Sequence, residues 1–248
     1  MPLPEPPETV QVPGAIFTTS WPVRSADVDP ERNLRLDGVA RYLQDIGFDN
    51  LDANGASEAH PLWIVRRTVI DVVRPIVWPS TVQLTRWCSG LSSRWCNMRV
   101  RIESDNGGLI DTEAFWININ PDSGMPSRIE EEFMAPMADT ATDHRLKWKR
   151  LLTEDAPADI ADVPFVLRGS DIDPLQHLTN SIYWQPIEDL VRVKTDLHAA
   201  PFRAVLEYMK PIEPGSTINI RSRDESDGLS AWFVSGDDTM AIARVTAQ

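Results

Sequence analysis

One phrase occurs twice in the chain, and this repeat limits the possible folds more than any other feature. Residues 27–34 read DVDPERNL and residues 171–178 read DIDPLQHL, an offset of 144 positions (171 − 27). Each copy runs Asp, aliphatic, Asp, Pro, two variable residues, a polar side chain and Leu. The polar residue is Asn33 in the first copy and His177 in the second. Such a repeat predicts a chain built from two similar units.

A second pair of segments supports the duplication. VIDVVRPIVWPSTVQL, residues 69–84, aligns with VLEYMKPIEPGSTINI, residues 205–220, at an offset of 136 (205 − 69). The two segments share aliphatic positions, an acid, a basic residue, Pro-Ile and a Ser-Thr run. Because both pairs occur in the same order, we expect a tandem duplication.

A helical pattern follows each copy of the phrase. In the first unit the apolar face of the predicted helix is Leu36, Val39, Ala40, Leu43 and Ile46. In the second unit the apolar face is Tyr183, Ile187, Leu190 and Val191. Pro186 lies well inside the second pattern, which predicts a kink in that helix.

Alternating residues after each helix predict antiparallel strands. The DNGG sequence at 105–108 predicts a hairpin turn, and a second strand-rich stretch covers 216–247. A sheet that curls around one helix buries that helix, and two such units can join edge to edge. The predicted fold class is therefore α+β, with two tandem units. The predicted division is a disordered lead-in (1–15), an N-terminal unit (16–133), a crossover linker (134–164) and a C-terminal unit (165–248).

Charge and composition exclude several classes of function. A net charge of −13 argues against a nucleic-acid partner. No apolar run reaches the roughly 18–20 residues of a membrane helix, and the Pro-rich start is unlike a signal peptide, so we expect a cytoplasmic protein. Cys88 and Cys96 are predicted to be free buried thiols, not metal ligands. His60, His144 and His198 are predicted to be solvated.

Three further stretches occur in order along the chain: WIVRRTVIDVVRPIVWPSTVQLTRW (63–87), FWININPDSGMPSRIEEEF (115–133) and RGSDIDPLQHLTNSIYW (168–184). Together they resemble the acyl-ACP thioesterases, enzymes that release fatty acids from acyl carrier protein. The last stretch is similar to the family signature R-x-x-D-h-D-x-N-x-H-x-N-N-x-x-Y, where h is apolar. The resemblance implies a double hotdog fold, in which each antiparallel sheet wraps a central helix. It also implies hydrolysis of acyl-ACP or acyl-CoA thioesters without a metal or cofactor.

The same signature implies site residues in this sequence. Asp173 and His177 match its catalytic positions, and Asn180 and Tyr183 match positions at the start of the helix. His177 could act as general base and Asp173 could orient it. Free N–H groups at residues 178–181 would then form an oxyanion site. The alternative is that Asp-x-Asp-Pro only shapes a turn, which we expect of the first copy.

The family places the acyl chain between the first unit's helix and sheet. This implies that Trp63 binds substrate, together with Leu43 and Ile46. Two positions depart from the signature: Leu175 replaces its catalytic Asn, and Pro211 replaces the acid expected after Lys210. Glu213 is the nearest acid that could substitute for the one missing at Pro211.

Two other functions stay open because of these departures. The protein could bind acyl or acyl-CoA groups without catalysis, or it could be an acyl-thioester hydratase or dehydratase. The expected partner is acyl carrier protein or coenzyme A. The cluster at 145–150, with Arg145, Lys147, Lys149 and Arg150, is a candidate docking patch for it. A fused pair of units could stand alone or form a homodimer.

Overall fold

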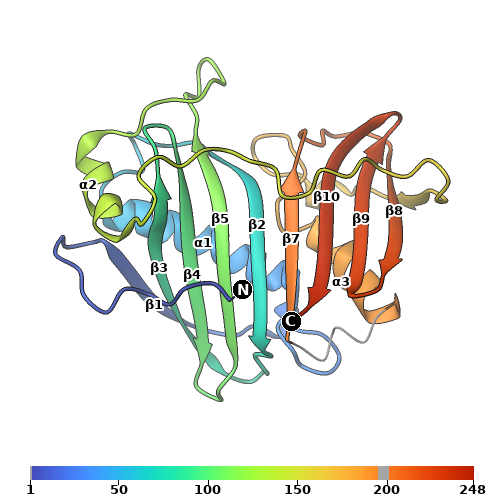
Figure 1. The fold of residues 1–248 in the computed structure, drawn as a ribbon, viewed down its shortest axis with the longest axis horizontal. Helices are drawn as coiled ribbons and strands as arrows, with labels where there is room; N and C mark the ends of the chain where they lie inside the picture. Colours follow the sequence, from blue (N-terminus) through green and yellow to red (C-terminus); the bar gives the residue numbers. More distant parts are fainter. Residues whose placement is uncertain (1, 195–200) are drawn as a thin grey trace.

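The computed structural model of the protein describes residues 2–194 and 201–248. Its strands form one ten-stranded antiparallel sheet in the order β1-β3-β4-β5-β2-β7-β10-β9-β8-β6 (Figure 1). The first five are β1 (Ile16–Pro22), β2 (Trp63–Arg74), β3 (Thr81–Leu91), β4 (Trp95–Ser104) and β5 (Leu109–Asn118). The other five are β6 (Val163–Phe165), β7 (Phe202–Tyr208), β8 (Ile218–Glu225), β9 (Gly228–Ser235) and β10 (Asp238–Ala247). The predicted α+β class and the DNGG hairpin are confirmed.

The sheet order shows the duplication directly. The first half reads β1-β3-β4-β5-β2, and the second half, read inward from its own edge, is β6-β8-β9-β10-β7. The two halves meet where β2 pairs antiparallel with β7. This seam removes one exposed edge from each unit, which is the reason that two curved sheets are more stable joined than separate.

Two charge pairs on the seam are related by the duplication. Arg67 pairs across the strands with Glu207, and Asp71 pairs with Arg203. The two arginines are 136 positions apart, because 67 + 136 = 203, and so are the two acids, because 71 + 136 = 207. Val69 and Val205 face each other at the midpoint of this arrangement. Each half therefore contributes one arginine and one acid to the same junction.

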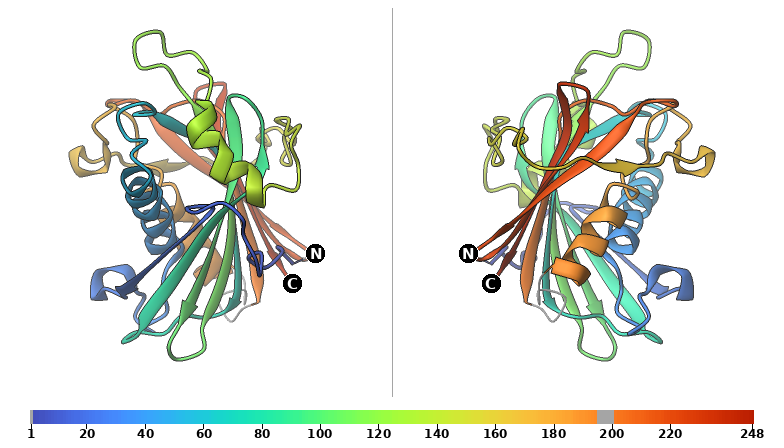
Figure 2. Two further views of the ribbon diagram at one scale, coloured as in Figure 1. Left: turned by 90° about the vertical axis from the view of Figure 1, so that its left-hand side faces the viewer. Right: turned by 90° about the vertical axis from the view of Figure 1, so that its right-hand side faces the viewer.

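Two helices cover one face of the sheet (Figure 2). Helix α1 (Leu36–Ala53) is the predicted first helix, and its five predicted core residues are all buried. Helix α3 (Trp184–Lys194) begins later than the pattern suggested. Turns occupy the preceding residues, so Pro186 lies in the first turn of α3, where its missing N–H removes no helical hydrogen bond. The prediction that Pro186 kinks the helix was therefore wrong.

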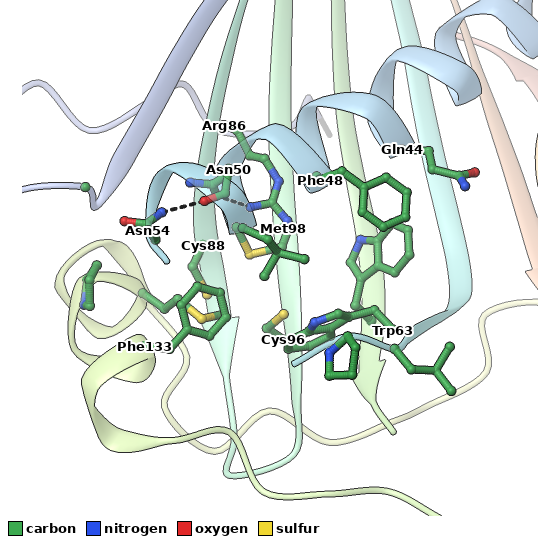
Figure 3. A pocket seen from close by; sticks show the side chains of 18 of the residues that line it. Gln44, Phe48, Asn50, Asn54, Trp63, Arg86, Cys88, Cys96, Met98 and Phe133 are labelled. Atoms are coloured by element: carbon green, nitrogen blue, oxygen red, sulfur yellow. Dashed lines mark hydrogen bonds between the residues drawn. The ribbon is translucent and has the colours of Figure 1, made fainter. Parts of the chain in front are cut away.

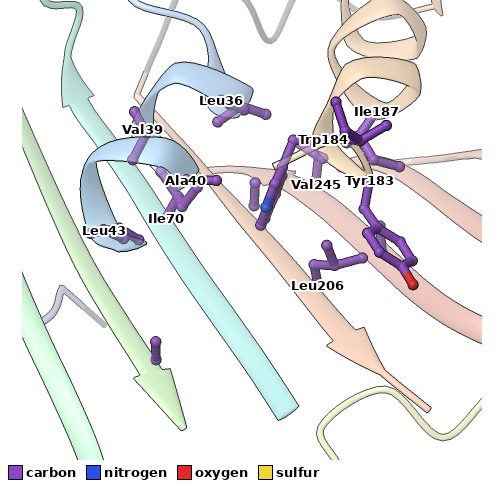
Figure 4. Close-up of a cluster of buried hydrophobic side chains, with 14 of the residues drawn as sticks. Leu36, Val39, Ala40, Leu43, Ile70, Tyr183, Trp184, Ile187, Leu206 and Val245 are labelled. Carbon is purple, nitrogen blue, oxygen red and sulfur yellow. The ribbon is translucent and has the colours of Figure 1, made fainter. Parts of the chain in front are cut away.

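The main core lies between these helices and the sheet. Leu36, Val39 and Ile187 from the helices pack with Ile70 and Leu206 from the central strands (Figure 4). This main core is continuous across both units. In the described part of the chain, no helix is long and apolar enough to cross a membrane.

The connection between the units runs over the sheet face opposite the long helices (Figure 1). It starts with helix α2 (Glu131–Thr140), which packs beside β3. Farther along, Leu152 and Ala156 cover a small apolar cluster of β9 and β10. At the other end of the chain, residues 2–15 form no helix or strand, although the N–H groups of Gln11 and Val12 donate to Asp139.

Candidate functional site at the second copy of the repeated turn

The repeated phrase folds into the same turn in both units. In the first copy, Asp29 Oδ1 accepts the N–H of Asn33 at 2.7 Å. In the second, Asp173 Oδ1 accepts the N–H groups of Leu175 at 2.9 Å and His177 at 3.0 Å. Each aspartate therefore uses one carboxylate oxygen to hold its turn, as Asp side chains commonly do. The motif therefore shapes a turn in both copies.

The N–H groups that follow the two turns differ. In the first unit the N–H of Leu36 donates to Glu188 Oε2 of α3 at 3.0 Å. The corresponding group in the second unit is the N–H of Asn180, because 36 + 144 = 180. By the same offset, the counterpart of Glu188 is Gln44, because 44 + 144 = 188. Within the described residues, neither Asn180 nor Ser181 has a hydrogen-bond acceptor for its N–H. At this one position, therefore, the N–H is bonded in the first copy and has no acceptor among the described residues in the second.

Asn180 borders a pocket of about 270 Å³. It lies between α1 and the inner face of β3, β4 and β5, with α2 at one end (Figure 3). Residues of the second unit, 173–175 and Asn180, complete its wall. Most of the remaining lining is apolar, and it includes Phe48, Met98, Trp116 and Phe133. The pocket can therefore take an apolar chain whose polar end lies against the second turn.

The predicted site residues are divided between this pocket and the core. Asp173, Asn180 and Trp63 line the pocket. His177 is half-buried, it does not line the pocket, and its imidazole makes no hydrogen bond within the described residues. Tyr183 is buried, with its ring 5.1 Å from Tyr208, so its place is in the core.

The expected slot residues are also divided. Leu43 lines only a small adjoining cavity with Gln44 and Asn180, whereas Ile46 is fully buried away from either space. The sequence predicted the turn at 173–177 and Trp63 as parts of the site. It did not predict that α2 and residues 14 and 15 line the pocket, because both depend on contacts between distant segments.

The two departures from the family signature have different surroundings. Leu175 is 49% exposed and lines the pocket, beside Asp173. It therefore supplies apolar surface where a polar group was expected. Pro211 and Glu213 are exposed, and the residue between them, Ile212, is buried and accepts the N–H of Leu178. Glu213 is not part of the pocket wall, so it does not replace the missing acid there.

His60 was predicted to be solvated, and this was wrong. Its side chain is buried between Trp63 and Phe133, and its Nε2 accepts the N–H of Glu130 at 3.3 Å. It helps to hold the start of α2 beside the pocket. His144 is exposed as predicted, and His198 lies outside the described residues.

The two cysteines are buried free thiols, as predicted. Burial raises the pKa of Cys88 to about 12, and burial also raises the pKa of Cys96. Both thiols line the pocket. They are therefore neutral at ordinary pH and do not serve as nucleophiles.

Glu188 gives the fold a pH dependence. Burial raises the pKa of its carboxyl to about 7, and the nearby Asp37 and Asp29 add to the rise, although the Leu36 N–H opposes it. Because the folded pKa lies above the ordinary value of 4.5, the folded state binds the proton more tightly. Stability should therefore fall as the pH rises from about 4.5 to above 7, by about 3 kcal/mol in total.

The variant Glu188→Gln tests this dependence. Its amide oxygen can still accept the Leu36 N–H, but it carries no charge to bury. We expect the substitution to raise the free energy of unfolding by about 1–3 kcal/mol near pH ~8 and to change it little near pH ~5. Denaturant unfolding at the two pH values measures both. Equal effects at both pH values would contradict the proposed ionisation.

A ten-stranded sheet made of two halves, with a long helix against each half, defines a double hotdog protein. Residues 14–137 match the acyl-ACP thioesterase N-terminal domain, and residues 155–241 match the acyl-ACP thioesterase C-terminal domain. The chain therefore belongs to the acyl-ACP thioesterase family.

Its relatives in sequence include characterised and uncharacterised proteins. An uncharacterized protein of Mycobacterium tuberculosis is 45% identical over 230 residues, which is 93% of this chain and 91% of the relative. The chloroplastic dodecanoyl-[acyl-carrier-protein] hydrolase of Cinnamomum camphora is 24% identical over 189 residues. That match covers 68% of this chain and 49% of the plant protein.

Solved structures confirm the fold. An acyl-ACP thioesterase from Bacteroides thetaiotaomicron has a TM-score of 0.79 at 13% identity, covering 94% of this chain and 98% of that one. The 12:0-ACP thioesterase from Umbellularia californica has a TM-score of 0.72 at 18% identity, covering 95% and 98%. At these identities the likeness concerns the architecture.

Proposed function

We propose that the protein hydrolyses fatty-acyl thioesters of acyl carrier protein, with the acyl chain in the pocket of the first unit. The observation that carries this proposal is the asymmetry between the two turns. Leu36 has its N–H capped by Glu188, whereas the equivalent N–H of Asn180 has no acceptor in the described part of the chain, and Asn180 borders the apolar pocket. A thioester carbonyl at Asn180 would place its oxygen at donors suited to an oxyanion.

The proposed reaction uses the second turn and the residues that follow it, up to Ser181. His177 removes a proton from water, the resulting hydroxide attacks the carbonyl carbon, and the oxygen becomes an oxyanion held by the N–H groups of Asn180 and Ser181. Collapse of this intermediate breaks the C–S bond, and the departing thiolate takes the proton back from the imidazolium. Asp173 contributes its second carboxylate oxygen, which has no hydrogen bond within the described residues, to position the water or the imidazolium.

Acyl carrier proteins are acidic, so docking needs local positive charge on this acidic chain. The crossover offers it: Arg145, Lys147 and Lys149 are exposed, while Trp148 between them packs against Phe115 and under the guanidinium groups of Arg66 and Arg67. Trp148 thus anchors the segment and leaves its cations facing solvent. We propose this patch, residues 145–149, as the carrier docking surface.

Non-catalytic acyl binding is the second candidate function. The observation that favours it is the His177 imidazole, which has no hydrogen bond to Asp173 and does not line the pocket. Such a protein would need the pocket and no base. Binding without turnover would be its signature.

Thiol release from acyl-ACP and acyl-CoA, over a series of chain lengths, separates the candidates. We expect release above the buffer rate, faster from acyl-ACP than from the matched acyl-CoA. Tight binding of acyl-ACP with no release would replace hydrolysis by acyl binding. Conversion of an unsaturated acyl thioester to its β-hydroxy form without release would identify a hydratase.

A further inference from the structure

The pocket contains one cation that the proposed reaction does not use. Arg86 extends from β3 toward Asn50 of α1, and its Nη1 donates to Asn50 Oδ1 (Figure 3). No described residue places a carboxylate within ion-pair distance of Arg86. Burial lowers the pKa of its guanidinium, but an arginine keeps its charge at ordinary pH. Arg86 is half-buried, and a cation removed from water without a counterion is costly, so its retention calls for a physical reason.

Three other arginines of the sheet each have an acid as partner. Arg99 reaches Glu113 at 2.8 Å, Arg203 reaches Asp71 at 2.6 Å and Arg67 reaches Glu207 at 3.3 Å. Each of these half-buried cations has an acid from a neighbouring strand. Arg86 lines the pocket instead, where the ionisable groups that act on its pKa are the neutral thiols of Cys88 and Cys96.

Asn50 adds an independent observation. Its Oδ1 is occupied by Arg86, and its Nδ2 is buried with no hydrogen-bond partner. The pocket therefore holds two neighbouring groups that both donate, and the described residues supply no acceptor for the amide. Buried donors left unpaired in this way cost free energy, which an acceptor from a ligand would recover.

The position of Arg86 and Asn50 in the pocket indicates which part of a bound ligand they would contact. Gln44, which shares the adjoining cavity with Asn180, lies six residues before Asn50 on α1. At 1.5 Å per residue this is about 9 Å along the helix axis. A chain with its thioester at Asn180 would therefore present its far end, not its carbonyl, to Arg86.

We propose that the preferred acyl group ends in a carboxylate, so that the substrate is an ω-carboxyacyl thioester held at its far end by Arg86 and Asn50. A guanidinium binds a carboxylate through two parallel hydrogen bonds, and the pair would neutralise the half-buried charge. This inference rests on the proposed function for the placement of the thioester, although binding of the chain end is separate from hydrolysis.

Non-hydrolysable pantetheine thioethers test the inference. Alkyl, ω-hydroxyalkyl and ω-carboxyalkyl chains of equal length are compared by calorimetry, over a series of lengths. We expect the ω-carboxyalkyl compound to bind at least about tenfold more tightly than the alkyl compound at the best length. Equal or tighter binding of the alkyl or ω-hydroxyalkyl compound would overturn the proposal.

Variants of Arg86 test whether this residue causes the preference for the ω-carboxylate. Arg86→Met should abolish or reverse the preference for the carboxylate, and Arg86→Lys should keep part of it. The control Arg94→Met removes an exposed arginine outside the pocket and should change nothing. An unchanged preference in Arg86→Met would overturn the proposal. If no thioester is hydrolysed but the carboxylate preference holds, the proposed hydrolysis fails and the inference about the pocket stands.

Discussion

Replacing His177 with alanine should lower kcat for thiol release by about 100- to 10,000-fold, the usual range for loss of a general base. The fold should survive the change. His177 holds its turn through its main chain, which donates to Asp173 and accepts the Asp173 N–H at 2.8 Å. Because the imidazole has no hydrogen bond within the described residues, its loss should cost little stability.

The duplicated turn supplies a matched control. Asn33 occupies the same place as His177 in the first copy, with the same main-chain bonds to Asp29. Asn33→Ala should leave kcat unchanged within about twofold, because the neighbouring N–H of Leu36 is already capped. Similar losses in both variants would mean that the substitutions act through the fold. An unchanged kcat in His177→Ala would remove His177 from the reaction.

Replacing Glu207 with leucine should lower the free energy of unfolding by about 3–5 kcal/mol, the cost of breaking a buried ion pair. Glu207 is fully buried on the seam and accepts from Arg67 at 3.3 Å and from the Leu151 N–H at 2.8 Å. Its loss leaves the Arg67 cation without its acid and removes the acceptor of the Leu151 N–H in the crossover. Chemical denaturation monitored by tryptophan fluorescence measures the change.

Two further variants test the reason for this loss. Asp238→Ala breaks an exposed pair with Lys210 and should cost under about 1 kcal/mol. The double variant Arg67→Met with Glu207→Leu should recover part of the loss, because no uncompensated charge then stays buried. If Glu207→Leu costs no more than Asp238→Ala, the seam is not held by this pair.

Much of the architecture could be predicted because it repeats within the sequence. The offset of 144 identified the two turns, and the offset of 136 identified β2 and β7, which carry equivalent arginines and acids at the seam. Helix α1 could be predicted because its apolar face is regular. Helix α3 was placed too early, since residues 179–183 have the composition of a helix start but form turns.

The differences between the halves could not be predicted in the same way. Glu188 and Gln44 are equivalent in sequence, yet only Glu188 caps the opposite helix, a contact across 152 positions of the chain. His60 and Arg86 are likewise defined by neighbours from distant segments, α2 and α1 respectively. A local sequence pattern does not indicate such contacts. The burial of His60 and the unpaired charge of Arg86 could therefore be seen only in the structure.

The most direct measurement is the place where a substrate analogue binds. An acyl pantetheine thioether with a photoreactive group at the chain end can be crosslinked to the protein, and the modified residues can be mapped by mass spectrometry. We expect adducts on the pocket wall, at Met98, Phe133 or the end of α1, and their loss when acyl-ACP competes. Adducts confined to segments outside that wall, or labelling that acyl-ACP does not reduce, would contradict an acyl chain held in the first unit with its thioester at the second turn.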